Sequence, residues 1–114
     1  MVEETIMNYL SKTLAVPVHM ERPENEPISY VLIEKTGSNT TNHIESATLA
    51  IQSYAASMYE AAVLNCRVKA AMNGSIQLPE ISRCDCNSDY NYTDTTKKKY
   101  RYQAVFDIVY LGGE

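Results

Sequence analysis

Basic and aromatic residues are interleaved near the end of the chain, in the segment KKKYRYQAVFDIVYL that ends at Leu111. Cations that contact phosphates and rings that stack on bases are what a nucleic-acid groove uses. The candidates are Lys97, Lys98, Lys99, Arg101, Tyr90, Tyr92, Tyr100 and Tyr102. The alternation of apolar residues, however, continues past the basic part up to Tyr110. This period of two favours a β-strand that is preceded by solvated lysines. A nucleic-acid-binding module that uses residues 97–102 stays open as an alternative.

Cysteine and histidine are the next residues that could do chemistry. The chain carries Cys66, Cys84, Cys86, His19 and His43. A structural zinc site usually shows ligand pairs at regular spacing, and these five are scattered. We therefore expect the cysteines to pack in the core or on a strand face, with no metal and no cofactor.

Motifs for nucleophilic catalysis or phosphate binding are missing from the sequence. It contains no GxSxG motif, and its four glycines do not build a phosphate-binding loop. His19 and His43 fall in or beside polar segments, where a histidine is more often a surface residue than a catalytic base. The sequence thus favours a protein that is not an enzyme, and a small enzyme or metal protein is the weakest hypothesis.

Length and composition limit the other possibilities. The chain has 114 residues, 45% of them hydrophobic, which fits one globular domain over residues 1–114. Its net charge of −4 lacks the overall basic character of a nucleic-acid-binding domain. No apolar run approaches the length of a membrane helix, the start does not resemble a signal peptide, and an odd number of cysteines suits a reducing cytosol.

Hydrophobic periodicity predicts the elements that must position these residues. We expect helices at residues 2–14 and 55–73, and strands at residues 18–21, 29–36, 44–54, 80–87 and 100–111. The polar segments 36–43 and 88–96 are expected to be long loops. The order α-β-β-β-α-β-β predicts an α+β fold with a single mixed, largely antiparallel sheet of about five strands and two helices packed on one face.

The second predicted helix carries two apolar stripes. One holds Ala55, Met58, Tyr59, Ala62, Cys66 and Ala70, and the other holds Ala61, Leu64, Val68 and Met72. A helix with one fully solvated face would not show this pattern. We expect one stripe to pack on the sheet and the other to meet another helix or another subunit.

The chain as a whole resembles the tail terminator (tail-completion, or head-tail joining) proteins of long-tailed phages, especially the small versions in prophages of Gram-positive bacteria. The segments that carry the resemblance are RPENEPISYVLIEKTGS and SDYNYTDTTKKKYRYQAVFDIVY, together with the helix SMYEAAVLNCRVKAAM between them. The resemblance implies a β-sheet flanked by helices. It also implies a structural function in the virion tail, after assembly in the cytoplasm of the bacterial host.

Proteins of this family form a ring, typically of six subunits, that caps the finished tail tube and stops its polymerisation. The implied partners are further copies of the chain, the tail tube protein and a head-completion or connector protein, with DNA only as passing cargo. Other ring-forming connector or tube components are similarly small and also contain both helices and strands, and they stay open as alternatives.

Interface residues can be expected at three places. The first is the predicted loop with Thr36, Gly37, Asn39, Thr41 and His43, which a partner would order. The second is the polar set Asp94, Lys97, Lys98 and Arg101, and the third is the helix stripe Ala61, Leu64 and Val68.

Overall fold

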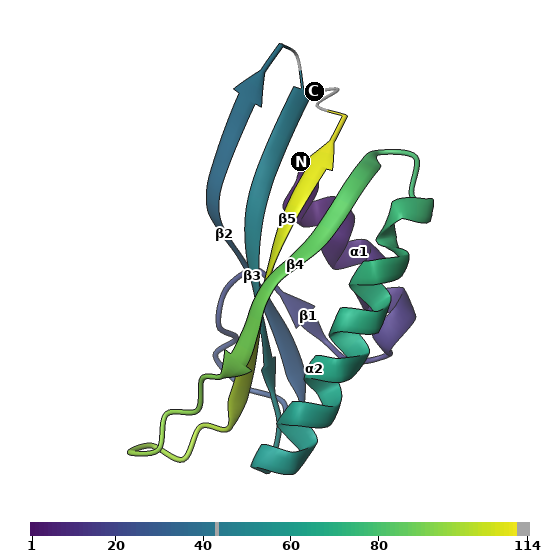
Figure 1. Ribbon diagram of the computed structural model, residues 1–114. Helices are drawn as coiled ribbons and strands as arrows, with labels where there is room; N and C mark the ends of the chain where they lie inside the picture. Colours follow the sequence, from purple (N-terminus) through teal and green to yellow (C-terminus); the bar gives the residue numbers. More distant parts are fainter. Residues whose placement is uncertain (43, 112–114) are drawn as a thin grey trace.

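The computed structural model describes residues 1–42 and 44–111 and contains two helices and five strands (Figure 1). The elements are α1 (Val2–Leu14), β1 (Val18–His19), β2 (Tyr30–Thr41), β3 (Ile44–Tyr54), α2 (Met58–Asn73), a 3-10 turn (Gly74–Gln77), β4 (Ile81–Asn91) and β5 (Arg101–Tyr110). The fold class and the element order predicted from the sequence are confirmed.

The five strands form one mixed sheet in the order β1-β2-β3-β5-β4. The short β1 runs parallel to β2, and every other neighbouring pair is antiparallel. Two hairpins, β2–β3 and β4–β5, therefore make up most of the sheet, and they join where β3 pairs with β5. This joining is the least local step of the fold, because α2 and β4 lie between the two strands in the chain.

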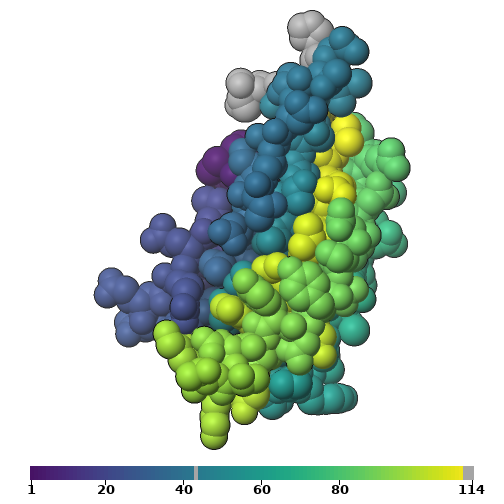
Figure 2. Space-filling model, turned by 60° about the vertical axis from the view of Figure 1, so that its left-hand side comes forward, coloured from purple at the N-terminus to yellow at the C-terminus, as the bar shows by residue number. Residues whose placement is uncertain are grey.

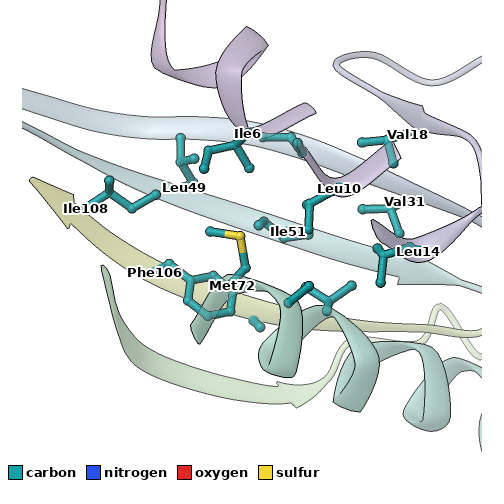
Figure 3. Close-up of a cluster of buried hydrophobic side chains, with 14 of the residues drawn as sticks. Ile6, Leu10, Leu14, Val18, Val31, Leu49, Ile51, Met72, Phe106 and Ile108 are labelled. Atoms are coloured by element: carbon teal, nitrogen blue, oxygen red, sulfur yellow. The ribbon is translucent and has the colours of Figure 1, made fainter. Parts of the chain in front are cut away.

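Both helices cover the same face of the sheet, and the core lies between the two layers (Figure 1). Helix α1 contributes Ile6, Leu10 and Leu14, whose spacing places them on one side of the helix. Figure 3 shows these side chains, with Met72 of α2, directed toward the sheet residues Val31, Leu49, Ile51, Phe106 and Ile108. The strict alternation of β5 is thus explained, because its even-numbered side chains face this core.

Helix α2 begins at Met58, three residues later than the sequence predicts. Ser57 has an extended backbone and acts as the N-cap, accepting a hydrogen bond from the backbone N–H of Glu60. The cap fixes the helix start, so Ala55 belongs to the connection from β3. The helix ends at Asn73, where the chain enters the 3-10 turn.

The expected loop at residues 36–43 is wrong, because Thr36, Gly37, Asn39 and Thr41 belong to β2. The strand stays paired with β3 up to Thr41, opposite Ile44, although its outer half is polar. Threonine fits an extended backbone, and the backbone ladder to β3 outweighs the local polarity that suggested a loop. Asn42 adopts a left-handed conformation with φ 51° at the turn, and His43 lies outside the described residues.

The second expected loop, at residues 88–96, is wrong in its first half. Strand β4 extends to Asn91, and an isolated bridge between Asp94 and Lys99 prolongs the β4–β5 hairpin beyond the two strands. Pairing with β5 supplies backbone partners for residues 88–91, which the polar sequence of this segment did not reveal. The connection is therefore a narrow extension of the sheet.

Candidate interaction surface

The helices α1 and α2 cover one face of the sheet, and we call the opposite face the open face. Figure 2 shows β2, β3, β5 and β4 side by side on this face with no helix across them. The open face carries the residues that alternate with the core residues, such as Thr48, Gln52 and Tyr54 on β3; Thr48 is half-buried, whereas Gln52 and Tyr54 are buried. Asp85 and Asp107 are exposed on this face, so its exposed part is suited to contacts with another protein or with solvent.

An aromatic column lies on the open face near the β4–β5 hairpin. The rings of Tyr30 and Tyr54 are stacked, with centroids 4.5 Å apart and an interplanar angle of 5°. The guanidinium of Arg101 lies 5.7 Å from the centroid of Tyr54 and 4.4 Å from that of Tyr92. Tyr90 meets Tyr92 edge to face. We call these five residues the tyrosine-arginine cluster; its cation–π contacts hold Arg101 between two rings.

Two glutamines connect the cluster across the middle of the sheet. Gln52 on β3 donates to Gln103 on β5 over 2.8 Å, and both side chains are buried. Gln52 also accepts from the hydroxyl of Tyr54 at 2.8 Å, and Gln103 donates to the hydroxyl of Tyr90. Arg101 donates to the Tyr54 hydroxyl at 2.9 Å. The network gives these buried amides partners, which avoids the cost of leaving polar groups unpaired.

Glu26 ties the loop after β1 to the hairpin. Its carboxylate accepts hydrogen bonds from the Tyr30 hydroxyl and from the ammonium of Lys99, each over 2.8 Å, and it pairs with Arg22 at 3.3 Å. The hydrogen bond from Lys99, followed by that from Tyr30, lowers the pKa of the Glu26 carboxyl. Burial raises the pKa of the Tyr30 hydroxyl, so it stays a donor.

The polar residues predicted near the β4–β5 connection occupy a defined turn. The carboxylate of Asp94 accepts hydrogen bonds from the backbone N–H groups of Thr96 and Lys97. Lys98 takes a left-handed conformation with φ 54°, and both Lys97 and Lys98 are exposed. Arg101 lies in the tyrosine-arginine cluster and is not free at the surface. Asp94, Lys97 and Lys98 thus share one hairpin tip, with Arg101 at its base.

This arrangement weakens the nucleic-acid interpretation of residues 97–102. Lys99 is paired with Glu26, and Arg101 is held by two tyrosines and by the backbone carbonyl of Tyr92. Two of the four clustered cations are therefore engaged within the protein. Two exposed lysines give little affinity for phosphates at physiological salt.

The polar half of β2 lies at the other end of the sheet from this hairpin tip (Figure 1). Thr36, Gly37, Asn39 and Thr41 are all exposed there. Gly37 and Asn39 line a shallow hollow of about 500 Å³ on the open face, together with Arg83, Asp85 and Asp107. The first and second sets of predicted interface residues consequently do not meet in one subunit.

The third predicted set, Ala61, Leu64 and Val68, is wrong as an interface, because all three side chains are buried in the protein's own core. The other stripe of α2 faces outward, with Tyr59, Cys66 and Ala70 exposed. Two apolar stripes on one helix do not reveal which one meets the sheet. The side chain of Val63, exposed beside Tyr59, extends the outward stripe.

Metal or thiol chemistry finds little support in the described residues. Among them, no group of three or more His, Cys, Asp or Glu side chains could hold a metal ion. Cys66 and Cys86 are exposed free thiols, and burial raises the pKa of the half-buried Cys84 thiol. In the part of the chain that the structure describes, neither helix is long and apolar enough to cross a membrane.

Sequence comparison with protein-family models and with curated proteins gives no relative of this chain. No protein-family model matches it, and no curated protein matches it significantly. Functional conclusions therefore rest on the surfaces described above. Among these, the sequence did not reveal the Gln52–Gln103 pair, because it does not show which residues of β3 and β5 lie opposite each other.

Proposed function

We propose that this chain is a structural subunit of a phage tail, a tail terminator that forms a ring on the end of the tail tube and joins it to the head connector. The ring has about six subunits by resemblance to that family. The protein acts in the virion tail after assembly in the host cytoplasm, and it performs no catalysis.

The observation that carries this proposal is the shape of the sheet. A five-stranded sheet has helices on one face, an open polar face on the other, and unpaired backbone on both outer strands. Backbone N–H and C=O groups on these outer strands have no partner within the subunit, so strands of neighbouring subunits can extend the sheet. This architecture agrees with the sheet flanked by helices that the resemblance implies.

The charge of the chain fits a ring through which DNA passes. The net charge is −4, and the open face carries the carboxylates of Asp85 and Asp107. Like charge keeps a polyanion from adhering to such a wall. By contrast, the clustered cations that a nucleic-acid-binding module would use are half engaged in internal contacts.

The direct test is a tube-growth assay. The tail tube protein of the same phage is polymerised alone and with the chain present, and tube lengths and ends are measured by electron microscopy. We expect shorter tubes that carry one extra ring at one end. An unrelated acidic protein of the same size is the control and should leave tube length unchanged.

Unchanged tube lengths with bare ends would contradict the terminator function. Incorporation along the whole tube would identify the chain instead as a tube component. Binding only to the isolated head connector would identify it as a connector protein.

A further inference from the structure

The sheet ends in two long strand edges that have no partner. On one side, β1 pairs only with Val31 and Leu32, which leaves residues 34–41 of β2 without a neighbour. On the other side, β4 is the last strand along its whole length. Proline, a common block on edge strands, is absent from both stretches. β-bulges interrupt both strands, yet they leave regular runs at residues 37–41 and 83–86.

The hydrogen-bond pattern identifies the backbone groups that point outward from β4. Tyr100 accepts from Ala55 next to β3, whereas Arg101 accepts from Tyr92 on the β4 side. Even-numbered residues of β5 therefore bond to β3, and odd-numbered ones bond to β4. Cys86 lies opposite the even-numbered Phe106, so its N–H points to the free edge.

The same alternation applies to β2. Val31, whose N–H bonds to Pro17 of the segment before β1, shows the outward direction of this strand. Ser38 lies opposite Ala47, and Ala47 pairs with the even-numbered Ile108 of β5. The backbone groups of Ala47 are thus used toward β5, and the N–H of Ser38 points away from β3 to the free edge.

The directions of the two edges match. Three antiparallel pairings separate β2 from β4, so the two strands run in opposite directions. A rotation of a second copy about an axis along the strands keeps both directions. It brings β4 of one copy beside β2 of the next as an antiparallel pair, with the helices of both copies on the same side of the sheet.

The lengths match as well. The free part of β2, residues 34–41, spans roughly 26 Å at roughly 3.3 Å per residue. β4 has 11 residues and is long enough to pair with all of it. This part of β2 is exposed on both faces, so a neighbouring strand would give it the support that it lacks in the single chain.

We propose that the partner of this surface is a second copy of the same chain, and that β4 of one subunit adds to β2 of the next to form one continuous sheet. This inference rests on the proposed ring function and specifies its interface. Because the two edges differ, the contact is head-to-tail, and repeating it around an axis closes a ring. The open faces then line one wall of the ring, and the helices line the other.

The test blocks each edge separately. Ser38→Pro and Cys86→Pro each remove one outward N–H and leave the bonds inside the sheet intact. We expect each variant to be monomeric by multi-angle light scattering under conditions in which the wild type assembles. Ser38→Ala and Cys86→Ala, which keep the N–H, should assemble like the wild type.

Mixing the two proline variants gives the sharpest outcome. One intact β2 edge meets one intact β4 edge, so an equimolar mixture should form a dimer and stop there. If Cys86→Pro alone is monomeric, Ser38→Pro forms a dimer and the mixture forms no new species, β4 pairs with β4 about a two-fold axis and the proposal is wrong.

If the proline variants do not fold, hydrogen exchange on the wild type tests the same strand pairing. The amides of Ser38 and Cys86 should exchange at least tenfold more slowly in the assembled protein than in the dilute monomer. A wild-type ring whose two amides stay unprotected overturns the strand pairing and leaves the terminator function standing. A wild type that stays monomeric, even with the tail tube, overturns both.

Discussion

The turns of the two hairpins lie at opposite ends of the sheet, and these two ends are stabilised in different ways (Figure 1). At the β4–β5 end, Tyr30, Tyr54, Tyr92 and Arg101 stack on the open face, and the ion pair of Lys99 with Glu26 fixes the connection. At the β2–β3 end, the side chains of residues 36–41 are all exposed, and their side-chain hydrogen bonds are short-range or lead to the neighbouring strand.

The two ends therefore differ in how many of their hydrogen-bonding groups are paired within the single chain. In the tyrosine-arginine cluster, Tyr30, Tyr54 and Arg101 have hydrogen-bond partners within the protein. The polar half of β2 has a backbone ladder on one side only, so its remaining hydrogen-bonding capacity is available to another strand. Stability and assembly are therefore expected to depend on different ends of the same sheet.

The largest effect should come from the centre of the tyrosine-arginine cluster. Tyr54→Ala removes the ring of a residue that is 4% exposed, and it deprives the Oε1 atom of the buried Gln52 of its hydrogen-bond donor. We expect a loss of about 3–5 kcal/mol in the free energy of unfolding, measured with urea. Ile44→Ala, at the exposed β2–β3 end, is the matched control and should cost less than about 0.5 kcal/mol. Equal losses would remove the distinction between the two ends.

A smaller loss is expected when the cation of the cluster is removed. Arg101→Met keeps a long apolar side chain but deletes the hydrogen bonds to Tyr54 and Tyr92 and the cation–π contacts. The free energy of unfolding should fall by about 1.5–3 kcal/mol. Lys98→Met, on the same hairpin but exposed, should be nearly neutral. A strong effect of Lys98→Met on stability would show that the tip is packed more firmly than we describe.

The Glu26 ion pair predicts how stability depends on pH. Because the pKa of Glu26 is lower in the folded protein than in the unfolded chain, the unfolded chain binds its proton first as the pH falls. The stabilisation is present above the unfolded pKa, near 4.5, and is lost as the pH falls through the folded value. Melting temperatures measured between roughly pH 6 and pH 3 should decline less in Glu26→Gln than in the wild type. Parallel declines would exclude this contribution.

The smallest effect on folding is expected at the polar half of β2. Asn39→Ala removes one side-chain hydrogen bond to Thr41 on an exposed strand. Urea unfolding should change by less than about 0.5 kcal/mol. A loss above about 1 kcal/mol would mean that this end contributes to the stability of the single chain, and the proposed difference between the two ends would be wrong.

The fold could be predicted where local pattern and burial agree. The even-numbered residues of β5 face the core as their alternation predicts, and Ile6, Leu10 and Leu14 lie on the buried side of α1. The loop expected at residues 36–43 failed because polar residues can form a strand when a neighbouring strand supplies the hydrogen bonds. The topology of the whole sheet decides which strand lies beside this segment, and the sequence of the segment alone does not show it.

The surfaces were harder to predict for a similar reason. The pairing of Gln52 with Gln103 depends on the register between two strands that lie far apart in the chain. The choice between the two stripes of α2 depends on how the helix is rotated on the sheet, which put Leu64 inside and Tyr59 outside. Neither fact can be derived from periodicity along a single segment.

The native mass of the wild-type protein tests the central claim that this chain is a ring subunit. It is measured by native mass spectrometry alone and with the tail tube, followed by class averages of the particles. We expect one closed species with a mass several times the 12.8 kDa of the chain and with rotational symmetry. A protein that stays at 12.8 kDa under both conditions, with no ring on the tube, would contradict it.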